Sequence, residues 1–300
     1  MTSEYIKQKA RELGASVCGI GRVYEETDPQ RDPFSILPNA KAIIGFGFAV
    51  PKGLYMAMDK KSQFYTYTNI GVKYIDEEMA EIFLLKMGGM IEDQGYDACL
   101  QKAIPNLRIK GDKTTNPEVF DTYELIHAEA VAEGKPVPDV IIDFGKAARA
   151  CGIGDMGLNG KIINKKYGPF MRYCFIITDM PLEYDEEINE DICDRCGKCI
   201  EACPGKAVSE NGLDTWQCSV YYKGAHKSNP FMTDEFLKDN PEREAILNGE
   251  KRFDAVSARE IYHELNFLPK TNWGYSPCLC GRKCDIACYN HLKGGNGLEE

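Results

Sequence analysis

Four cysteines crowd into one short stretch of this sequence, CDRCGKCIEACPG at residues 193–205. Their spacing, C-x2-C-x2-C-x3-C-P, is the pattern with which bacterial ferredoxins hold cubane [4Fe–4S] clusters, three thiolates binding one cluster and the fourth binding its neighbour. Zinc also binds cysteine pairs, but a tetrahedral site with four ligands does not account for three closely spaced cysteines and a displaced fourth. The stretch therefore predicts an iron–sulfur module.

A second cluster needs cysteines from elsewhere in the chain. The tail segment WGYSPCLCGRKCDIACYNHL holds four, and LDTWQCSVYY holds one between the two groups. We predict two clusters whose ligands cross between the motifs. The first cluster would take Cys193, Cys196, Cys199 and Cys288, and the second Cys203, Cys218, Cys280 and Cys284. Cys278 remains a rival for the place of Cys218 or Cys280.

The other four cysteines have apolar or small neighbours. Free cysteine is among the most buried residue types, so we expect these four in the protein core, away from metal. They are Cys18, Cys99, Cys151 and Cys174.

Composition limits the surroundings of this module. The chain has 300 residues and is 43% hydrophobic, which is enough for a buried core. Its net charge of −10 argues against a nucleic-acid backbone or an anionic membrane as the main partner. The first residues lack the pattern of a signal peptide, and no apolar run is long enough to span a bilayer. Clustered cysteines suit metal binding in a reducing compartment, so we predict a cytoplasmic protein with no membrane partner.

Helix-like and strand-like patterns alternate before the cysteines, which predicts an α+β fold. The acidic segment 181–191 separates them from the cysteine region, so we expect two domains, residues 1–190 and 191–300. We predict an opening amphipathic helix, buried strands at 40–50, 138–144 and 172–180, and a long helix at 75–94. The broad apolar stripe of that long helix would contain Met79, Ile82, Phe83, Leu85, Met90 and Ile91.

A glycine motif at residues 152–157, GIGDMG, formally matches the dinucleotide-binding pattern G-x-G-x-x-G. That motif must follow its strand at once and open a helix. Here the helix-like KAARAC comes first, and the following LNGKIINKKYGPF has no helical period. Tight turns are therefore the alternative to nucleotide binding.

The stretch KAARACGIGDMGLNGKIINKKYGPFMRYCFIITDMPLEYDEE, followed by both cysteine groups, resembles the shared core of epoxyqueuosine reductases and corrinoid reductive dehalogenases. The resemblance covers roughly residues 40–290. It implies a nitroreductase-like α/β domain followed by a ferredoxin-like module with two [4Fe–4S] clusters. It also implies an oxidoreductase in which these clusters feed electrons to base-off cobalamin, which acts on an organic substrate.

The same resemblance assigns roles to individual residues, each of which has an alternative as part of a turn or of the core. The residues implied to border the corrinoid are Gly154, Gly157, Asn159, Gly160, Tyr167, Gly168 and Arg172. The implied proton donor is Asp143, near the acid of epoxyqueuosine reductases but offset by several residues, or Tyr67, which matches the tyrosine of dehalogenases.

The sequence also departs from that family. The tail lacks a second C-x2-C-x3-C-P, because Tyr289 stands in place of the proline, and about sixty residues separate Cys218 from Cys278. We find no helical-repeat extension of the kind epoxyqueuosine reductases use on tRNA, and no twin-arginine leader. We therefore expect a small-molecule substrate and a low-potential electron donor such as ferredoxin or flavodoxin, with no nucleic-acid partner. Two alternatives stay open, an electron-transfer or activating protein without its own substrate and an epoxyqueuosine reductase acting on tRNA.

Overall fold

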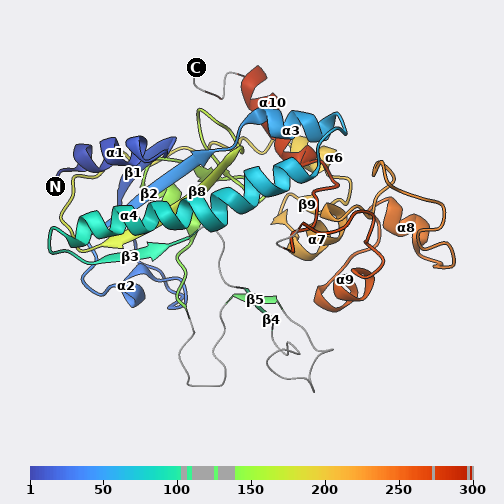
Figure 1. Ribbon diagram of the computed structural model, residues 1–300, viewed down its shortest axis with the longest axis horizontal. Coiled ribbons are helices and arrows are strands. Elements are labelled where there is room, and N and C mark those ends of the chain that lie inside the picture. The colour runs from blue at the N-terminus through green and yellow to red at the C-terminus, as the bar shows by residue number, and fades with distance from the viewer. Residues whose placement is uncertain (103–106, 110–124, 128–138, 272–273, 296–297, 299–300) are drawn as a thin grey trace.

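The computed structural model describes residues 1–102, 107–109, 125–127, 139–271, 274–295 and 298. A four-stranded sheet with the order β1–β2–β8–β3 lies at its centre (Figure 1). Each strand pairs antiparallel with its neighbour. The strands are β1 (Val17–Arg22), β2 (Ala42–Ala49), β8 (Met171–Thr178) and β3 (Ala98–Gln101). The predicted strands at 40–50 and 172–180 are confirmed as β2 and β8.

Strand β8 is apolar on both faces, because helices cover the sheet on both sides. Alternate side chains point to opposite faces of a strand. Cys174 and Ile176 accordingly pack in one hydrophobic cluster, and Phe175 and Ile177 pack in another. Arg172 lies on the same face of the sheet as Cys174, and its side chain therefore points toward η1 (Tyr67–Met79).

The first face is covered by α1 (Ser3–Glu12), which confirms the opening helix, and by a long helix in two parts. A π-helix, η1 (Tyr67–Met79), continues directly into α4 (Ala80–Glu92). Extended π-helical geometry is rare and frequently marks functional sites. The predicted long helix is thus confirmed, although it begins earlier than the sequence indicated.

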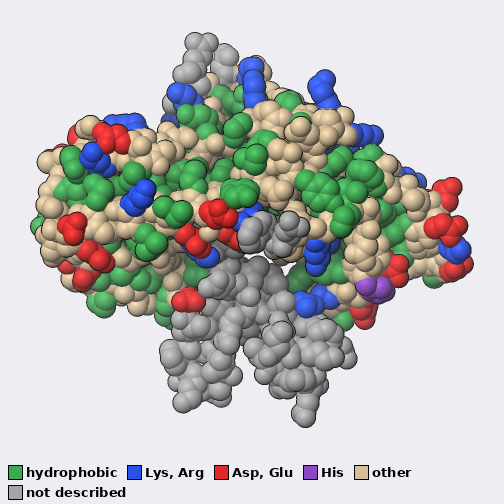
Figure 2. Space-filling view, in the orientation of Figure 1, with side chains coloured by type: hydrophobic (Ala, Val, Ile, Leu, Met, Phe, Trp, Pro, Cys, Tyr) green, Lys and Arg blue, Asp and Glu red, His purple; other side chains and the backbone are tan. Residues whose placement is uncertain are grey.

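The apolar stripe of this helix is narrower than predicted. Residues that recur at helical spacing on α4 are buried against the sheet: Ala80, Phe83, Leu84, Met87 and Ile91. Ile82 and Leu85 point the other way and are 55% and 67% exposed. Hydrophobic side chains gather on the face over α4 in Figure 2.

The second face is covered by α5 (Phe144–Ala150), the helix expected from KAARAC. Its end approaches the sheet so closely that a Cβ at Gly19 would lie 1.9 Å from the Cys151 carbonyl oxygen. The strand predicted at 138–144 is wrong over residues 139–144, the last of which begins α5, while Pro138 lies outside the described residues. The Asp143 side chain accepts a hydrogen bond from the Lys146 amide at 3.0 Å and thereby starts the helix.

The glycine-rich passage forms a small hairpin of β6 (Asp155–Met156) and β7 (Ile162–Ile163). Residues 181–191 then form an irregular segment, as expected. Short elements complete this part of the chain: α2 (Pro33–Ile36), α3 (Lys52–Asp59), β4 (Leu107–Ile109) and β5 (Leu125–His127).

The cysteine region consists of short elements with small cores of their own. They are α6 (Lys198–Ala202), β9 (Val208–Ser209), β10 (Gly212–Leu213), α7 (Thr215–Tyr222), α8 (Arg243–Leu247), α9 (Ala255–Ile261) and α10 (Lys283–Gly294). The residues between Cys218 and Cys278 bury their own hydrophobic cluster, which includes Val220, Ile246 and Phe253. Helix α10 returns to pack against both α6 and α3. Within the described residues, none of the helices has the length and apolar character needed to cross a membrane.

Candidate metal centre

The first cysteine group surrounds a small cavity between the loop before α6 and helix α10. Cys193, Cys196, Cys199 and Cys288 all line it. The loop can wrap the cavity because Arg195 and Gly197 adopt positive φ angles of 56° and 76°. The structure therefore brings together the four residues predicted for the first cluster.

The second group gathers Cys203 at the end of α6, Cys218 in α7, Cys280 before α10 and Cys284 within it. Burial raises the pKa of the Cys218 thiol to about 12, and the neighbouring Cys280 and Cys203 add to the rise. Burial likewise raises the pKa of Cys284, with Cys280 and Cys218 among its neighbours. Cys203 and Cys284 also pack on the apolar cluster that holds Cys199 and Cys193. The two groups are therefore adjacent, as crossed ligation requires.

The donors of both groups suit iron–sulfur clusters. Four thiols converge in each group, and soft thiolates are the ligands that such clusters take. Burial raises the pKa of Cys199 and of Cys218, so these groups stay neutral thiols until a metal ion displaces their protons. The residues present therefore fit two cubane clusters.

Cys278 is a fifth thiol beside the second group. It is fully buried, and its Sγ lies 3.7 Å from the Sγ of Cys280. Of the four cysteines expected in the core, Cys151 and Cys174 are buried, while Cys18 and Cys99 are half-buried.

A set of buried polar side chains lies on the face of the sheet that carries η1. The Arg172 guanidinium donates from Nε to the Gly71 carbonyl oxygen at 3.1 Å and from Nη2 to the Tyr67 hydroxyl at 3.4 Å. Its Nη1 lies 3.5 Å from an oxygen of Asp76. Tyr67 and Asp76 are each 1% exposed. The π-helix thus holds a phenol and a carboxylate against one arginine of β8.

The tail contributes a second part of this polar set. Arg282 contacts Asp285 through Nε at 2.7 Å and Nη2 at 2.6 Å, and Asp285 is fully buried. The amide of Asn159 donates to the other oxygen of Asp285 at 3.1 Å. Asn159 therefore ties the glycine-rich hairpin to the start of α10.

The charges in this set perturb one another. Burial raises the pKa of Tyr67 to about 12, although the positive charges of Arg282 and Arg172 act in the opposite direction. Burial lowers the pKa of Lys161 to about 7, and the same two arginines lower it further. A lysine that titrates near neutral pH is suited to proton transfer.

Two oxygens beside this set lack partners among the described residues, Oδ1 of Asp76 and Oδ1 of Asn69. An unpaired buried polar atom costs free energy, and a bound ligand or water is a common reason for its retention. No sequence pattern pointed to Asp76, which lies inside η1. Lys161, Arg282 and Asp285 each stand beside a predicted site residue, but a charge next to a motif is usually exposed.

The two proposed proton donors lie on opposite faces of the sheet. Ile142 and Phe144, which flank Asp143, pack in the hydrophobic cluster under α5, whereas Tyr67 packs in the cluster under η1. The Asp143 side chain caps α5 and lies 3.6 Å from Arg31. Its role as an acid stays a prediction from the resemblance.

Only some of the residues implied to border the corrinoid lie in the buried polar set. Asn159 and Arg172 belong to the buried polar set. The glycines instead make room for side chains of the protein, since a Cβ at Gly154, Gly157 or Gly160 would lie within 2.8 Å of Ile162, Ile163 or Leu213 respectively. Gly168, with φ +58°, turns beside Tyr289, and Tyr167 packs half-buried on the α5 side of the sheet. The hairpin therefore offers a corrinoid no open glycine cradle.

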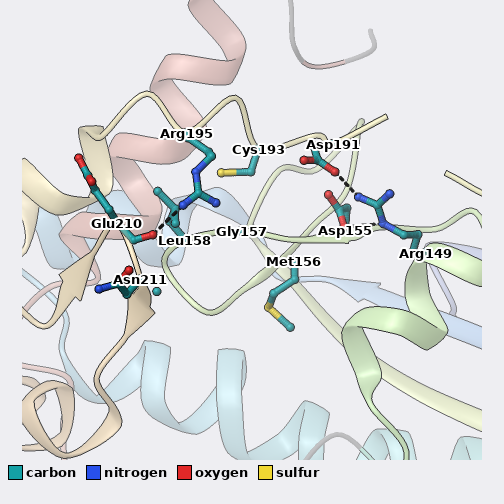
Figure 3. Close-up of a pocket in the computed structure, with 11 residues that line it drawn as sticks. Arg149, Asp155, Met156, Gly157, Leu158, Asp191, Cys193, Arg195, Glu210 and Asn211 are labelled. Atoms are coloured by element: carbon teal, nitrogen blue, oxygen red, sulfur yellow. Dashed lines mark hydrogen bonds and ion pairs between the residues drawn. The ribbon is translucent and has the colours of Figure 1, made fainter. Parts of the chain in front are cut away.

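An open cavity of about 370 Å³ lies beside Cys193 (Figure 3). Arg149 from α5 stands on one side, with Nε 3.0 Å from Asp155 and a further ion pair to Asp191. Arg195 stands on the other side and donates to the Glu210 carbonyl oxygen at 2.6 Å. The Arg149 contacts fix the segment that leads from the sheet into the first cysteine group.

Comparison with known proteins confirms the resemblance seen in the sequence. Residues 186–209 match the family described as a 4Fe-4S binding domain. The epoxyqueuosine reductase of Bacillus subtilis is 27% identical over 220 residues, which cover 71% of this chain and 47% of that protein. The epoxyqueuosine reductase of Cyclobacterium marinum is 31% identical over 97 residues, 32% of this chain and 30% of that protein. The chain spans about half or less of these relatives.

Solved structures show the same relationship at the level of the fold. The epoxyqueuosine reductase of Streptococcus thermophilus superposes with a TM-score of 0.50 at 17% identity, over 96% of this chain and 66% of that one. A catabolic reductive dehalogenase matches with a TM-score of 0.46 at 15% identity, over 86% of this chain and 35% of that one. The match to the Streptococcus thermophilus structure and the matched family over residues 186–209 together confirm a mixed α and β fold with a 4Fe-4S domain.

The expected partners are corrected by these comparisons. One solved structure is of an epoxyqueuosine reductase with an epoxyqueuosine-modified tRNA-Tyr stem loop, with a TM-score of 0.45 at 16% identity, over 95% of this chain and 69% of that one. The correction rests on the curated relatives, which are named epoxyqueuosine reductases. A small-molecule substrate without a nucleic-acid partner was the wrong expectation. Net charge misled because it sums the whole surface and carries no information about a local binding site.

Proposed function

We propose that this chain is an iron–sulfur reductase of the epoxyqueuosine reductase type, which reduces an epoxide carried on tRNA. The observation that carries the proposal is that possible electron carriers, the cysteines, lie beside possible proton donors, the buried polar set. Arg282 of the buried polar set lies between Cys280 and Cys284 in the chain and pairs with Asp285, which follows Cys284, so the second cysteine group borders that set. Electrons and protons would therefore arrive at one place.

The cysteines supply the electrons in this proposal. The first cluster is held by Cys193, Cys196, Cys199 and Cys288, and the second by Cys203, Cys218, Cys280 and Cys284. Cubane clusters pass single electrons, so two clusters store the pair that a reduction consumes. Reduced thiols and clusters persist in a reducing compartment, which supports a cytoplasmic location.

The proton comes from the polar set. Opening the C–O bond of an epoxide leaves charge on oxygen, which a positioned acid neutralises. Tyr67 is that acid in our proposal, since Arg172 holds its hydroxyl at 3.4 Å. The ammonium of Lys161, whose pKa is lowered by burial to about 7 and which shares the neighbours Arg172 and Arg282 with Tyr67, would return a proton to the phenolate.

A corrinoid is the cofactor we propose between the clusters and the substrate, within a nitroreductase-like domain. It would supply a reducible cobalt that handles electron pairs. The unpaired oxygens of Asp76 and Asn69, with Arg172, are the groups on the Tyr67 side that would bind its polar periphery. The hairpin glycines pack against Ile162, Ile163 and Leu213, so the proposal takes the cofactor contacts from the Tyr67 side.

Anaerobic reconstitution with iron and sulfide, followed by addition of cobalamin, tests this function. We expect about eight irons per chain, a spectral shift when cobalamin binds, and reduction of an epoxyqueuosine-containing tRNA stem loop. A protein with eight irons that binds neither cobalamin nor the stem loop would instead be an electron carrier for another enzyme. Stoichiometric zinc would overturn both readings.

A further inference from the structure

The second cysteine group contains one thiol more than a cubane cluster requires. Cys203, Cys218, Cys280 and Cys284 already provide four, and Cys278 lies beside them. Cys278 is completely buried and Cys280 is 8% exposed. A buried thiol of this kind is either core filling or a ligand in its own right.

The two sulfurs are in direct contact, at a separation that also fits a shared metal ion. Two thiolates bound to one tetrahedral ion through bonds of about 2.3 Å lie about 3.8 Å apart. The Sγ atoms of Cys278 and Cys280 lie 3.7 Å apart. Each sulfur can therefore reach a coordination position on the same iron with little movement.

The loop that carries the pair is held between the two cysteines and turns directly after the second. The Leu279 amide donates to the Tyr222 carbonyl oxygen at 2.8 Å, which fixes the residue between the two cysteines. Gly281 and Arg282 follow with positive φ angles of 65° and 49°, and this turn leads into α10. Because the backbone is fixed, exchange of one sulfur for the other needs only side-chain rotation.

The two cysteines have different neighbours. The charge of Cys278 acts on Tyr67 and Tyr222, whose pKa values are raised first by burial and further by that charge. Cys280 instead acts on Cys218 and Cys284. Cys280 thus faces the other ligands, whereas Cys278 faces the tyrosines of the polar set.

We propose that Cys278 and Cys280 share one iron of the second cluster, with Cys280 as the resting ligand and Cys278 as its replacement. In the exchange the Fe–S bond to Cys280 breaks, the Fe–S bond to Cys278 forms, and the proton of the Cys278 thiol passes to the Cys280 sulfur. No electron is transferred and the iron keeps its oxidation state. The inference rests on the second cluster of the proposed function.

Iron content and the EPR spectrum of the reduced full-length protein test the sharing. We expect Cys278→Ala to retain about eight irons and the wild-type spectrum. Cys280→Ala should also retain about eight irons but show shifted g values for the second cluster, because a different sulfur binds its iron. The double variant should fall to about four. Loss of four irons in either single variant would overturn the sharing.

Two controls separate the possible failures. Cys174→Ala removes an equally buried thiol from the sheet and should change neither iron content nor spectrum. If the wild-type protein itself holds about four irons, the second cluster and the proposed function fail, which differs from loss confined to Cys280→Ala. Where an alanine variant does not fold, valine at the same position repeats the test, since its side chain fills the volume of the thiol and has no atom that can bind iron.

Discussion

The two cysteine groups differ in how they are built and in how far they lie from solvent. Three of the four thiols of the first group come from one loop and its short helix, and Cys196 is exposed. The second group gathers residues up to 81 positions apart, from Cys203 to Cys284, and adjoins the buried Tyr67. One group therefore faces the outside, and the other faces the polar set.

This difference gives a direction to electron flow. A cluster in the first group is within reach of an external donor, and the open cavity beside Cys193 brings solvent close to it. None of the four thiols of the second group is exposed and Cys280 is buried, and solvent exposure changes reduction potential as well as access. The first group is thus suited to receive electrons and the second to deliver them beside the proton source.

The largest effect should follow from removing Cys203, the cysteine through which the first motif contributes to the second cluster. Cys203→Ala should abolish turnover, because Cys203 belongs to the first motif by sequence and to the second cluster by our assignment. Iron should fall from about eight to about four per chain, with the EPR signal of the first cluster retained. If the first cluster is lost and the second survives, ligation does not cross between the motifs.

Tyr67→Phe should lower turnover by roughly a hundredfold or more, the usual scale for loss of a general acid, while iron content and cobalamin affinity stay unchanged. Tyr173→Phe is the matched control, since that tyrosine is buried on the opposite face of the same sheet. Equal effects of the two substitutions would remove the catalytic role of Tyr67.

Lys161 should set a pH dependence that the clusters alone do not have. Burial lowers its pKa to about 7, so the ammonium is present below that pH and is lost above it. Turnover should therefore fall as pH rises from 6 to 8.5, by up to about tenfold per pH unit. Lys161→Met should flatten this profile of kcat/KM, whereas exposed Lys165→Met should leave it unchanged. An unaltered profile in Lys161→Met would show that another group titrates.

The smallest effect concerns Asp143, on the other face of the sheet. Asp143→Ala should cost about 1 kcal/mol of the free energy of unfolding, because it removes the cap of α5. Turnover per folded molecule should not change. It is obtained by dividing the measured activity by the folded fraction that a denaturant titration gives. A hundredfold loss of turnover without loss of stability would instead restore Asp143 as the proton donor.

The sequence predicted what depends on local pattern. Strands β2 and β8 are continuous apolar runs, and the first cysteine group has a fixed spacing, so both could be identified before the structure. Strand β1 was missed because its sequence, VCGIGR, has glycines where a strand usually carries branched side chains. Those glycines are needed because the end of α5 lies against the strand, which is a tertiary contact.

In the candidate site too, some residues could be identified from the sequence, and others depend on tertiary contacts. Tyr67 and Arg172 were proposed from resemblance, but the partners that perturb them come from distant segments. Asp285 is fully buried although a lone aspartate is usually exposed, and its bonds with Arg282 and Asn159 make that burial tolerable. Pairings of this kind have no signature in a single sequence.

Helix α10 carries Cys284 and Cys288, which we assign to different clusters, one turn apart. Four residues of α-helix rise about 6 Å, and this rise hardly varies as a protein fluctuates. The spacing of the two clusters is thus set by one rigid turn of α10, whereas the proposed proton donor, Tyr67, lies on a separate helix, η1. Fluctuations of the fold would leave electron transfer between the clusters intact while they move Tyr67 away from the substrate. Catalytic turnover would therefore be lost before electron transfer between the clusters is lost.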